Sequence, residues 1–99
     1  MKERIVDIQP GPKGKKYQAT VRGPEGTRKI NFGDSAMEQY RDSTPVQQYS
    51  SQDHGDPKRR KAYFQRHSGV GTKGEALQKE KRESQGMYTA KILAHQYLW

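Results

Sequence analysis

The chain has 99 residues, and only 29% of them are hydrophobic, which predicts one small domain, residues 1–99, with a thin core. Its net charge of +8 favours polyanions or acidic proteins as partners, and the lack of cysteine excludes disulfides and thiolate zinc sites. Its apolar runs are too short to span a membrane and its start lacks a secretory signal, so we expect a soluble intracellular protein.

Residues 1–34 have mainly the pattern of β-strands. Residues 4–8 alternate weakly in polarity and end at Pro10-Gly11-Pro12, which is typical of a short strand followed by a loop. Residues 15–22 and 27–32 alternate more clearly, and the Gly-Pro-Glu-Gly sequence between them supplies a turn. We therefore predict a β-hairpin or a three-stranded antiparallel sheet in this part of the chain.

Two less regular segments follow. A short helix carrying Met37 and Tyr40 can begin at Asp34 or Ser35, because either side chain can cap its first turn. Residues 42–55 contain many small polar residues, which predicts a loop. The apolar side chains expected to pack this loop are Val46 and Tyr49.

The strongest helix signal begins at Asp56. Asp56 can cap the helix, Pro57 suits its first turn, and Ser68-Gly69 predicts its end. This helix carries a cluster of cations: Lys58, Arg59, Arg60, Lys61 and Arg66. Successive positions turn by about 100°, so not all of these cations can address one surface, but Lys58, Lys61, Arg59 and Arg66 could line one side of the helix. The cluster is either a functional basic surface or a solvated helix face.

Two further helices are predicted near the end of the chain. Thr72 and Glu75 form a capping box for a polar, exposed or frayed helix over residues 73–84. Thr89 can cap a helix over residues 90–99. We expect it to be the chief core helix because its apolar residues gather on one side: Ala90, Leu93 and Tyr97 in one stripe, with Ala94 and Leu98 beside it. Residues 35–99 are therefore mainly helices and loops. Strands followed by two to four short helices indicate the α+β class.

A second set of cations lies in the predicted hairpin: Lys13, Lys15, Lys16, Arg22, Arg28 and Lys29. The candidate binding residues among them are Lys15, Lys16, Arg28 and Lys29. A two-stranded ribbon can enter the major groove of DNA, so these side chains could contact nucleic acid. Lysines on exposed strands also prevent sheets from pairing edge to edge. Both interpretations fit the pattern.

Four acidic and histidine side chains have donor types that could bind a divalent metal or perform acid–base chemistry: Asp53, His54, Asp56 and His67. Nothing in their spacing fixes a geometry, and His67 lies about three helical turns beyond Asp56. Capping and packing explain them more simply. Known phosphate-loop, nucleophile-elbow and zinc-helix motifs are absent, so we expect no enzyme, no cofactor and no metal.

Four segments in combination resemble a family of small proteins. They are K-K-Y-Q-A-T-V at Lys15 to Val21, I-N-F-G-D at Ile30 to Asp34, D-H-G-D-P-K-R-R-K-A-Y-F-Q-R-H at Asp53 to His67, and Y-T-A-K-I-L-A-H-Q-Y-L-W at Tyr88 to Trp99. The family comprises small basic, largely uncharacterised proteins of large double-stranded DNA viruses of algae and protists, with related patterns in marine phages. The resemblance implies viral origin and possible incorporation into a particle.

These observations give two hypotheses. The first is a minor capsid protein that bridges or lines larger capsid subunits, located in the virion and in the host cell interior during infection. Its docking side chains would be Tyr63, Phe64, Tyr97 and Trp99. The second is a viral protein that binds DNA or RNA, with the cations of the Asp56 helix on phosphates.

Overall fold

The protein, in a computed structural model that describes residues 1–99, has a three-stranded sheet followed by three α-helices. The strands are β1 (Arg4–Pro10), β2 (Lys15–Gly23) and β3 (Gly26–Asp34), which pair antiparallel in the order β1-β2-β3. A 3₁₀ turn, Ser50–Gln52, precedes the helices α1 (Pro57–Ser68), α2 (Lys73–Glu83) and α3 (Ala90–Tyr97). The predicted α+β class is confirmed.

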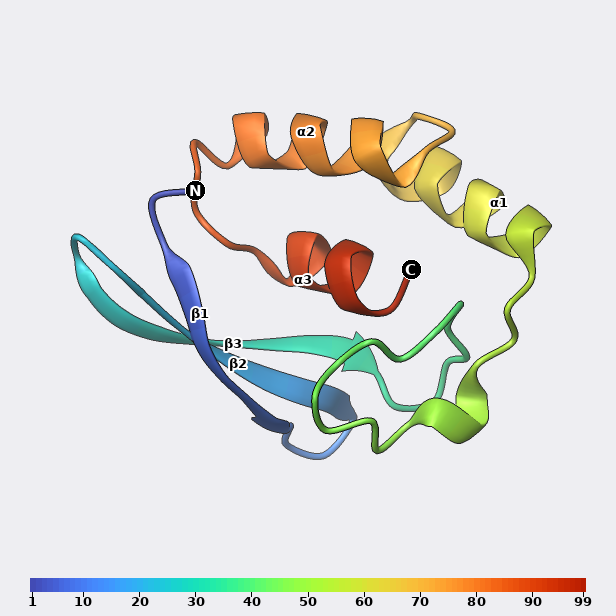
Figure 1. The fold of residues 1–99 in the computed structure, drawn as a ribbon, viewed down its shortest axis with the longest axis horizontal. Helices are drawn as coiled ribbons and strands as arrows, with labels where there is room; N and C mark the ends of the chain where they lie inside the picture. Colours follow the sequence, from blue (N-terminus) through green and yellow to red (C-terminus); the bar gives the residue numbers. More distant parts are fainter.

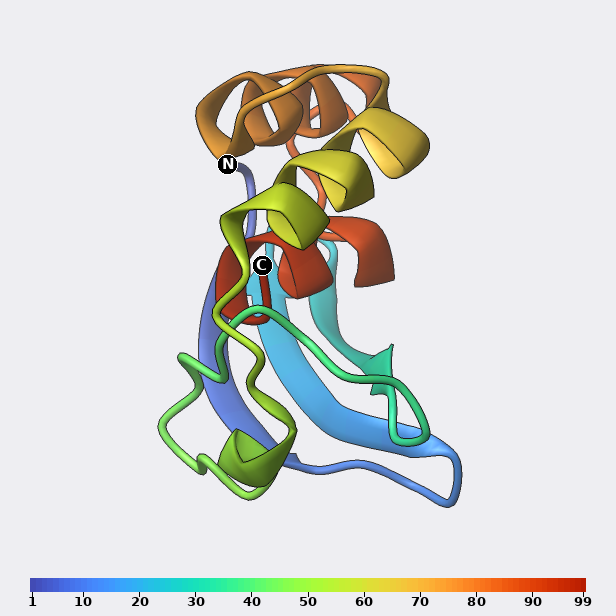
Figure 2. The same cartoon turned by 90° about the vertical axis from the view of Figure 1, so that its right-hand side faces the viewer.

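The elements form three layers (Figure 1 and Figure 2). The sheet is one outer layer, α1 and α2 together form the other, and α3 lies between them. Consistent with this order, α3 contacts both β3 and α2. The middle helix, α3, therefore connects the sheet to the outer layer that α1 and α2 form.

A β-bulge lets β1 present two isoleucines to the same side. Ile5 pairs with Val21 and Ile8 pairs with Ala19, and the register shifts between Ile5 and Asp7. Without an extra residue, positions 5 and 8 would point to opposite faces, because side chains alternate along a strand. The bulge therefore keeps both isoleucines on the face that packs against α3.

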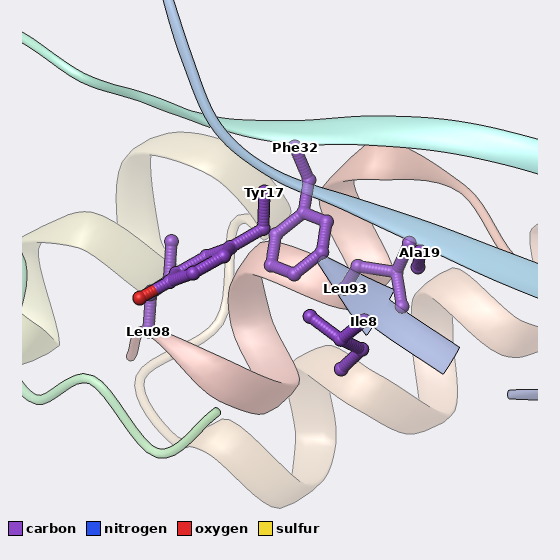
Figure 3. Packing of buried hydrophobic residues seen from close by; sticks show 6 residues of the cluster. All are labelled: Ile8, Tyr17, Ala19, Phe32, Leu93 and Leu98. Atoms are coloured by element: carbon purple, nitrogen blue, oxygen red, sulfur yellow. The ribbon is translucent and has the colours of Figure 1, made fainter. Parts of the chain in front are cut away.

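The main core lies between the sheet and α3, as Figure 3 shows. Its buried members are Ile8, Tyr17, Ala19, Phe32, Leu93 and Leu98. A second cluster, Tyr63, Phe64 and Ala76, joins α1 to α2. Trp99 packs against both clusters, and its ring stacks on that of Tyr63 with centroids 4.1 Å apart and planes 5° apart. Trp99 thus closes the core of its own chain.

The helix caps follow the predicted signals. The side chains of Asp56, Thr72 and Thr89 each accept a hydrogen bond from a backbone N–H in the first turn of α1, α2 and α3. Gly69, with φ of 70°, ends α1 in the left-handed conformation that glycine adopts without strain. Contrary to the prediction, α3 ends at Tyr97. None of the helices has both the length and the apolar character needed to cross a bilayer.

The predicted short helix after β3 does not form. The carboxylate of Asp34 accepts a hydrogen bond from the backbone N–H of Ala36, which makes a turn, and Met37 is 61% exposed. A helix here would have little apolar surface to bury, whereas the irregular course lets Gln39 reach both Lys16 and Asp53. The loop over residues 42–55 forms as predicted, but only its tyrosine packs on the core, because Val46 is exposed.

Candidate functional site

Four of the predicted cations lie together on the solvent side of α1. Lys58, Arg59, Lys61 and Arg66 are all exposed. At 100° per residue they span an arc of about 160° on the helix, opposite the side that buries Tyr63, Phe64 and Ser68. We refer to these four residues as the cationic arc. These four are the cations that the helical spacing indicated could line one side of the helix.

Arg60 does not belong to this surface. Its Nε donates a hydrogen bond to the carbonyl oxygen of Trp99 at 2.8 Å, and its guanidinium lies 4.6 Å from the ring centroid of Tyr40. Lys73 similarly donates to the carbonyl of Gln96 at 3.0 Å. Cations are favourable at the C-terminal end of a helix, where carbonyl groups lack partners. The prediction of Arg60 as a binding cation is therefore corrected: it holds the carbonyl of Trp99, two residues beyond the end of α3.

Two further lysines hold the end of α1 in the same way. Lys79 donates to the carbonyl of Ser68 at 2.7 Å, and Lys91 donates to the carbonyl of His67 at 3.2 Å. Part of the positive charge therefore joins the three helices to one another and compensates for the small core.

Replacing Arg60 by glutamine should lower the free energy of unfolding by about 2 kcal/mol, because a hydrogen bond from a charged donor and a contact with Tyr40 are lost. The matched control is Lys61→Gln, which removes the same charge from the exposed neighbouring position. Urea denaturation of both variants measures the difference. Equal losses would contradict a role for Arg60 in holding Trp99 and Tyr40.

The cations of the hairpin differ in whether they reach the surface. Lys15 and Lys29 are exposed, but Lys16 is only 1% exposed and its ammonium donates to the carbonyl of Met37 and to the side chain of Gln39. Burial lowers the pKa of Lys16, although nearby aspartates oppose the shift. The prediction of Lys16 as a surface cation is wrong, because residues 37–39 fold over it.

Arg28 is also bound by other groups of the chain. Its Nε and Nη2 donate to the two carboxylate oxygens of Glu3 at 2.8 and 2.7 Å, and Nη2 also donates to the carbonyl of Tyr88. The hydrogen bonds from Arg28 lower the pKa of Glu3. Arg28 therefore fastens the start of the chain to the sheet, which corrects its prediction as a free anion-binding residue.

The four aromatic residues proposed for docking pack within the chain. Tyr63 is 8% exposed and Phe64 is 1% exposed, so neither is on a surface that a partner can reach, and that prediction is corrected. Tyr97 is half-buried against Phe32, with ring centroids 6.1 Å apart, and Trp99 stacks on Tyr63. With few aliphatic residues available, the chain uses its aromatics to fill its own core.

A buried polar network lies between α1, α2 and α3. His95 is fully buried, with Nδ1 2.8 Å from the hydroxyl of Tyr63 and Nε2 2.7 Å from Oγ of Ser68. Because Ser68 donates its own proton to Glu80 at 2.9 Å, it must accept from Nε2, so Nδ1 accepts from Tyr63. We call Tyr63, His95, Ser68 and Glu80 the His95 network; all of its hydrogen bonds point towards Glu80.

Burial lowers the pKa of His95 to about 4, despite the attraction of Glu80, and burial also raises the pKa of Tyr63. A neutral imidazole matches the donor and acceptor pattern of the network. Ser68 and His95 are buried, and Ser68 lies between His95 and Glu80, so the network joins the three helices in the interior of the protein. No local pattern predicts this network, because Glu80 and His95 are distant in the chain from Tyr63 and Ser68.

The structure brings no metal-binding group together. His54 Nδ1 accepts from the backbone N–H of Asp56 at 3.0 Å, Asp53 accepts hydrogen bonds within the loop, and Asp56 caps α1. His67 lies on α1, where burial lowers its pKa. No three His, Cys, Asp or Glu side chains are grouped so that they could hold an ion.

A groove of about 660 Å³ lies between α1, α3, the end of β3 and residues 37–39. Its apolar lining includes Met37, Ala62, Ala90, Ala94 and Leu98. Its cationic lining comprises the buried Lys16 together with Arg59, Arg66 and Lys91, and the two arginines also belong to the cationic arc. The sequence assigned Ala90 and Ala94 to the core, but Ala90 is exposed and Ala94 half-buried. Their small side chains leave the space that forms the groove.

Two surfaces beside α1 are candidates for binding a partner. One is the cationic arc on the outer side of α1, and the other is the groove beside it. Comparisons of the chain with protein-family models, with curated proteins and with solved structures give no match.

Proposed function

We propose that the protein binds nucleic acid through the cationic arc, by contacts to phosphates. The observation that carries this proposal is the concentration of Lys58, Arg59, Lys61 and Arg66 on the exposed side of an outer helix. Only Arg59 has an acidic partner, Glu38 at 3.0 Å, and both side chains are about half exposed. An exposed pair of this kind is weak and can be exchanged for a phosphate.

The same geometry determines the kind of binding. Long cationic side chains on a convex helix surface neutralise phosphates and release condensed counterions, so affinity falls as salt rises. Sequence readout needs side chains that reach base edges in a fixed geometry, such as asparagine or a bidentate arginine held by its neighbours. The four side chains of the arc have no such support except the Arg59–Glu38 pair. We therefore propose binding with little base preference.

A structural role in a virion, as a minor capsid protein beside larger capsid subunits, is the second candidate. The observation that favours it is the groove, because an apolar floor is suited to a protein segment. The aromatic residues first assigned to docking no longer support this role, since they fill the core.

The double variant Lys58→Glu/Lys61→Glu should lose at least about tenfold in affinity for a fluorescent duplex oligonucleotide at low salt. The slope of log affinity against log salt concentration should also become shallower, by the amount that corresponds to about two fewer phosphate contacts. The matched control is Lys13→Glu/Arg22→Glu, which changes the charge equally at exposed positions of the sheet region. Fluorescence anisotropy over a salt series measures both. If both double variants lose affinity equally, or neither does, α1 is not the contact surface.

A further inference from the structure

We propose that the groove binds an amphipathic helix of a partner protein, with acidic side chains at the end of that helix that lies beside Arg66 and Lys91. The inference rests on the groove and holds whether or not the outer side of α1 binds nucleic acid. Three properties support it: the shape of the floor, the distribution of charge along the groove, and the nature of its walls.

The floor is apolar and made of small side chains. Ala62 on α1 and Ala90 and Ala94 on α3 line it, and the two alanines of α3 are four residues apart, so they lie on one side of that helix. Leu98 and the 61% exposed Met37 add apolar surface at one end. Small residues let a third helix approach closely, while flexible methionine adapts to its side chains.

Charge is distributed unevenly along the groove. At one end, Arg59 pairs with Glu38 and Asp34 lies nearby in the lining, so the charges there are mixed. At the other end, Lys91 reaches the carbonyl of His67, and Arg66 lies beside that histidine in α1.

The groups that face the second end leave it positive. Glu80 is 3.8 Å from Lys91, but its side chain is only 10% exposed, whereas that of Lys91 is 46% exposed, and Glu80 does not line the groove. Burial, Arg66 and Lys91 all lower the pKa of His67, so its imidazole is neutral near pH 7. An incoming segment therefore meets two cations at this end, and carboxylates complement them.

The walls favour a helical occupant over an extended one. Two sides of the groove are helices, α1 and α3, whose backbone groups are already hydrogen-bonded within the chain. An extended peptide would leave its own backbone N–H and C=O groups without partners, whereas a helix satisfies them internally. A helix also presents apolar residues at the i, i+3, i+4 and i+7 spacing that a groove between helices recognises.

The test uses the full chain labelled with ¹⁵N and a synthetic helical peptide with leucines at that spacing and glutamates at one end. Titration should shift the amide signals of Ala62, Ala90 and Ala94, and a peptide with lysines in place of the glutamates should bind at least about tenfold more weakly. The variant Ala62→Glu places an acid in the groove and should weaken binding by a similar factor.

The matched control is Gln65→Glu, which adds the same charge to the same helix at an exposed position outside the groove. It should retain the affinity of the unchanged chain, and Ala90→Trp, which fills the groove at an exposed position, should lose it. The inference is overturned if Gln65→Glu and Ala62→Glu weaken binding equally, if the lysine peptide binds as well, or if the acidic peptide does not bind. It is also overturned if a duplex oligonucleotide shifts the groove signals and the peptide does not.

Discussion

Replacing Asp42 by alanine is expected to lower the free energy of unfolding by about 3 to 4 kcal/mol, a large share of the stability of a domain of this size. Asp42 is 3% exposed, and its carboxylate accepts hydrogen bonds from the N–H and hydroxyl of Thr44, the N–H of Tyr49 and the hydroxyl of Tyr17. Alanine would leave these donors buried without a partner.

The environment of Asp42 shows how strongly this site depends on its charge. Burial alone would raise the pKa of its carboxyl, but the hydrogen bonds from Thr44, Tyr17 and Tyr49 outweigh burial and lower the pKa. Asp7→Ala is the control, because that exposed carboxylate accepts only from Gln9 and should cost less than about 0.5 kcal/mol. Denaturant midpoints compare the two, and similar small losses would show that Asp42 does not organise the loop.

Lowering the pH from 7 to 4 is expected to remove about 3 kcal/mol of stability through His95 alone. The unfolded chain binds a proton at this residue below the ordinary pKa of 6.5, whereas the folded chain stays neutral until about pH 4. The stabilisation is therefore complete above pH 6.5 and is lost between pH 6.5 and pH 4. The lowered pKa values of His54 and His67 act in the same direction.

Thermal unfolding between pH 4 and pH 8 measures this effect, and His95→Gln separates it from other titrations. The variant removes the ionisable ring, so its stability should fall less steeply with acid, although it is less stable at pH 7. Phe32→Leu, a change in the core between the sheet and α3, should also be less stable but should keep the slope of the unchanged chain. A slope that His95→Gln leaves unaltered would contradict the role of this histidine.

Local signals predicted the elements that depend on local chemistry. The caps at Asp56, Thr72 and Thr89 act within one helical turn, and strand alternation placed β2 and β3 correctly, so these features needed no knowledge of distant residues. The segment after Asp34 depends on distant contacts with Lys16 and Asp53, and there the expected helix was wrong. A cap signal cannot form a helix that has no apolar face to bury.

The candidate site was predictable only in part. The cationic helix was visible as a run of Lys and Arg, but the run does not show that Arg60 points inward to Trp99 while its neighbours point outward. The groove was missed because alanine fits a core position and a groove floor equally well. Whether Ala94 is buried in the core or lines a groove depends on the distance between α1 and α3, which the larger residues around them set.

The central place of α3 has a consequence for the order of folding. The sheet makes few direct contacts with α1 and α2. The sheet and the α1–α2 pair would therefore each expose an apolar surface to water until α3 packs between them. The element that joins them is also the last of the helices to leave the ribosome. Tertiary order in the sheet and in the α1–α2 pair should therefore arise together and late, when Leu93, Leu98 and Trp99 become available to both.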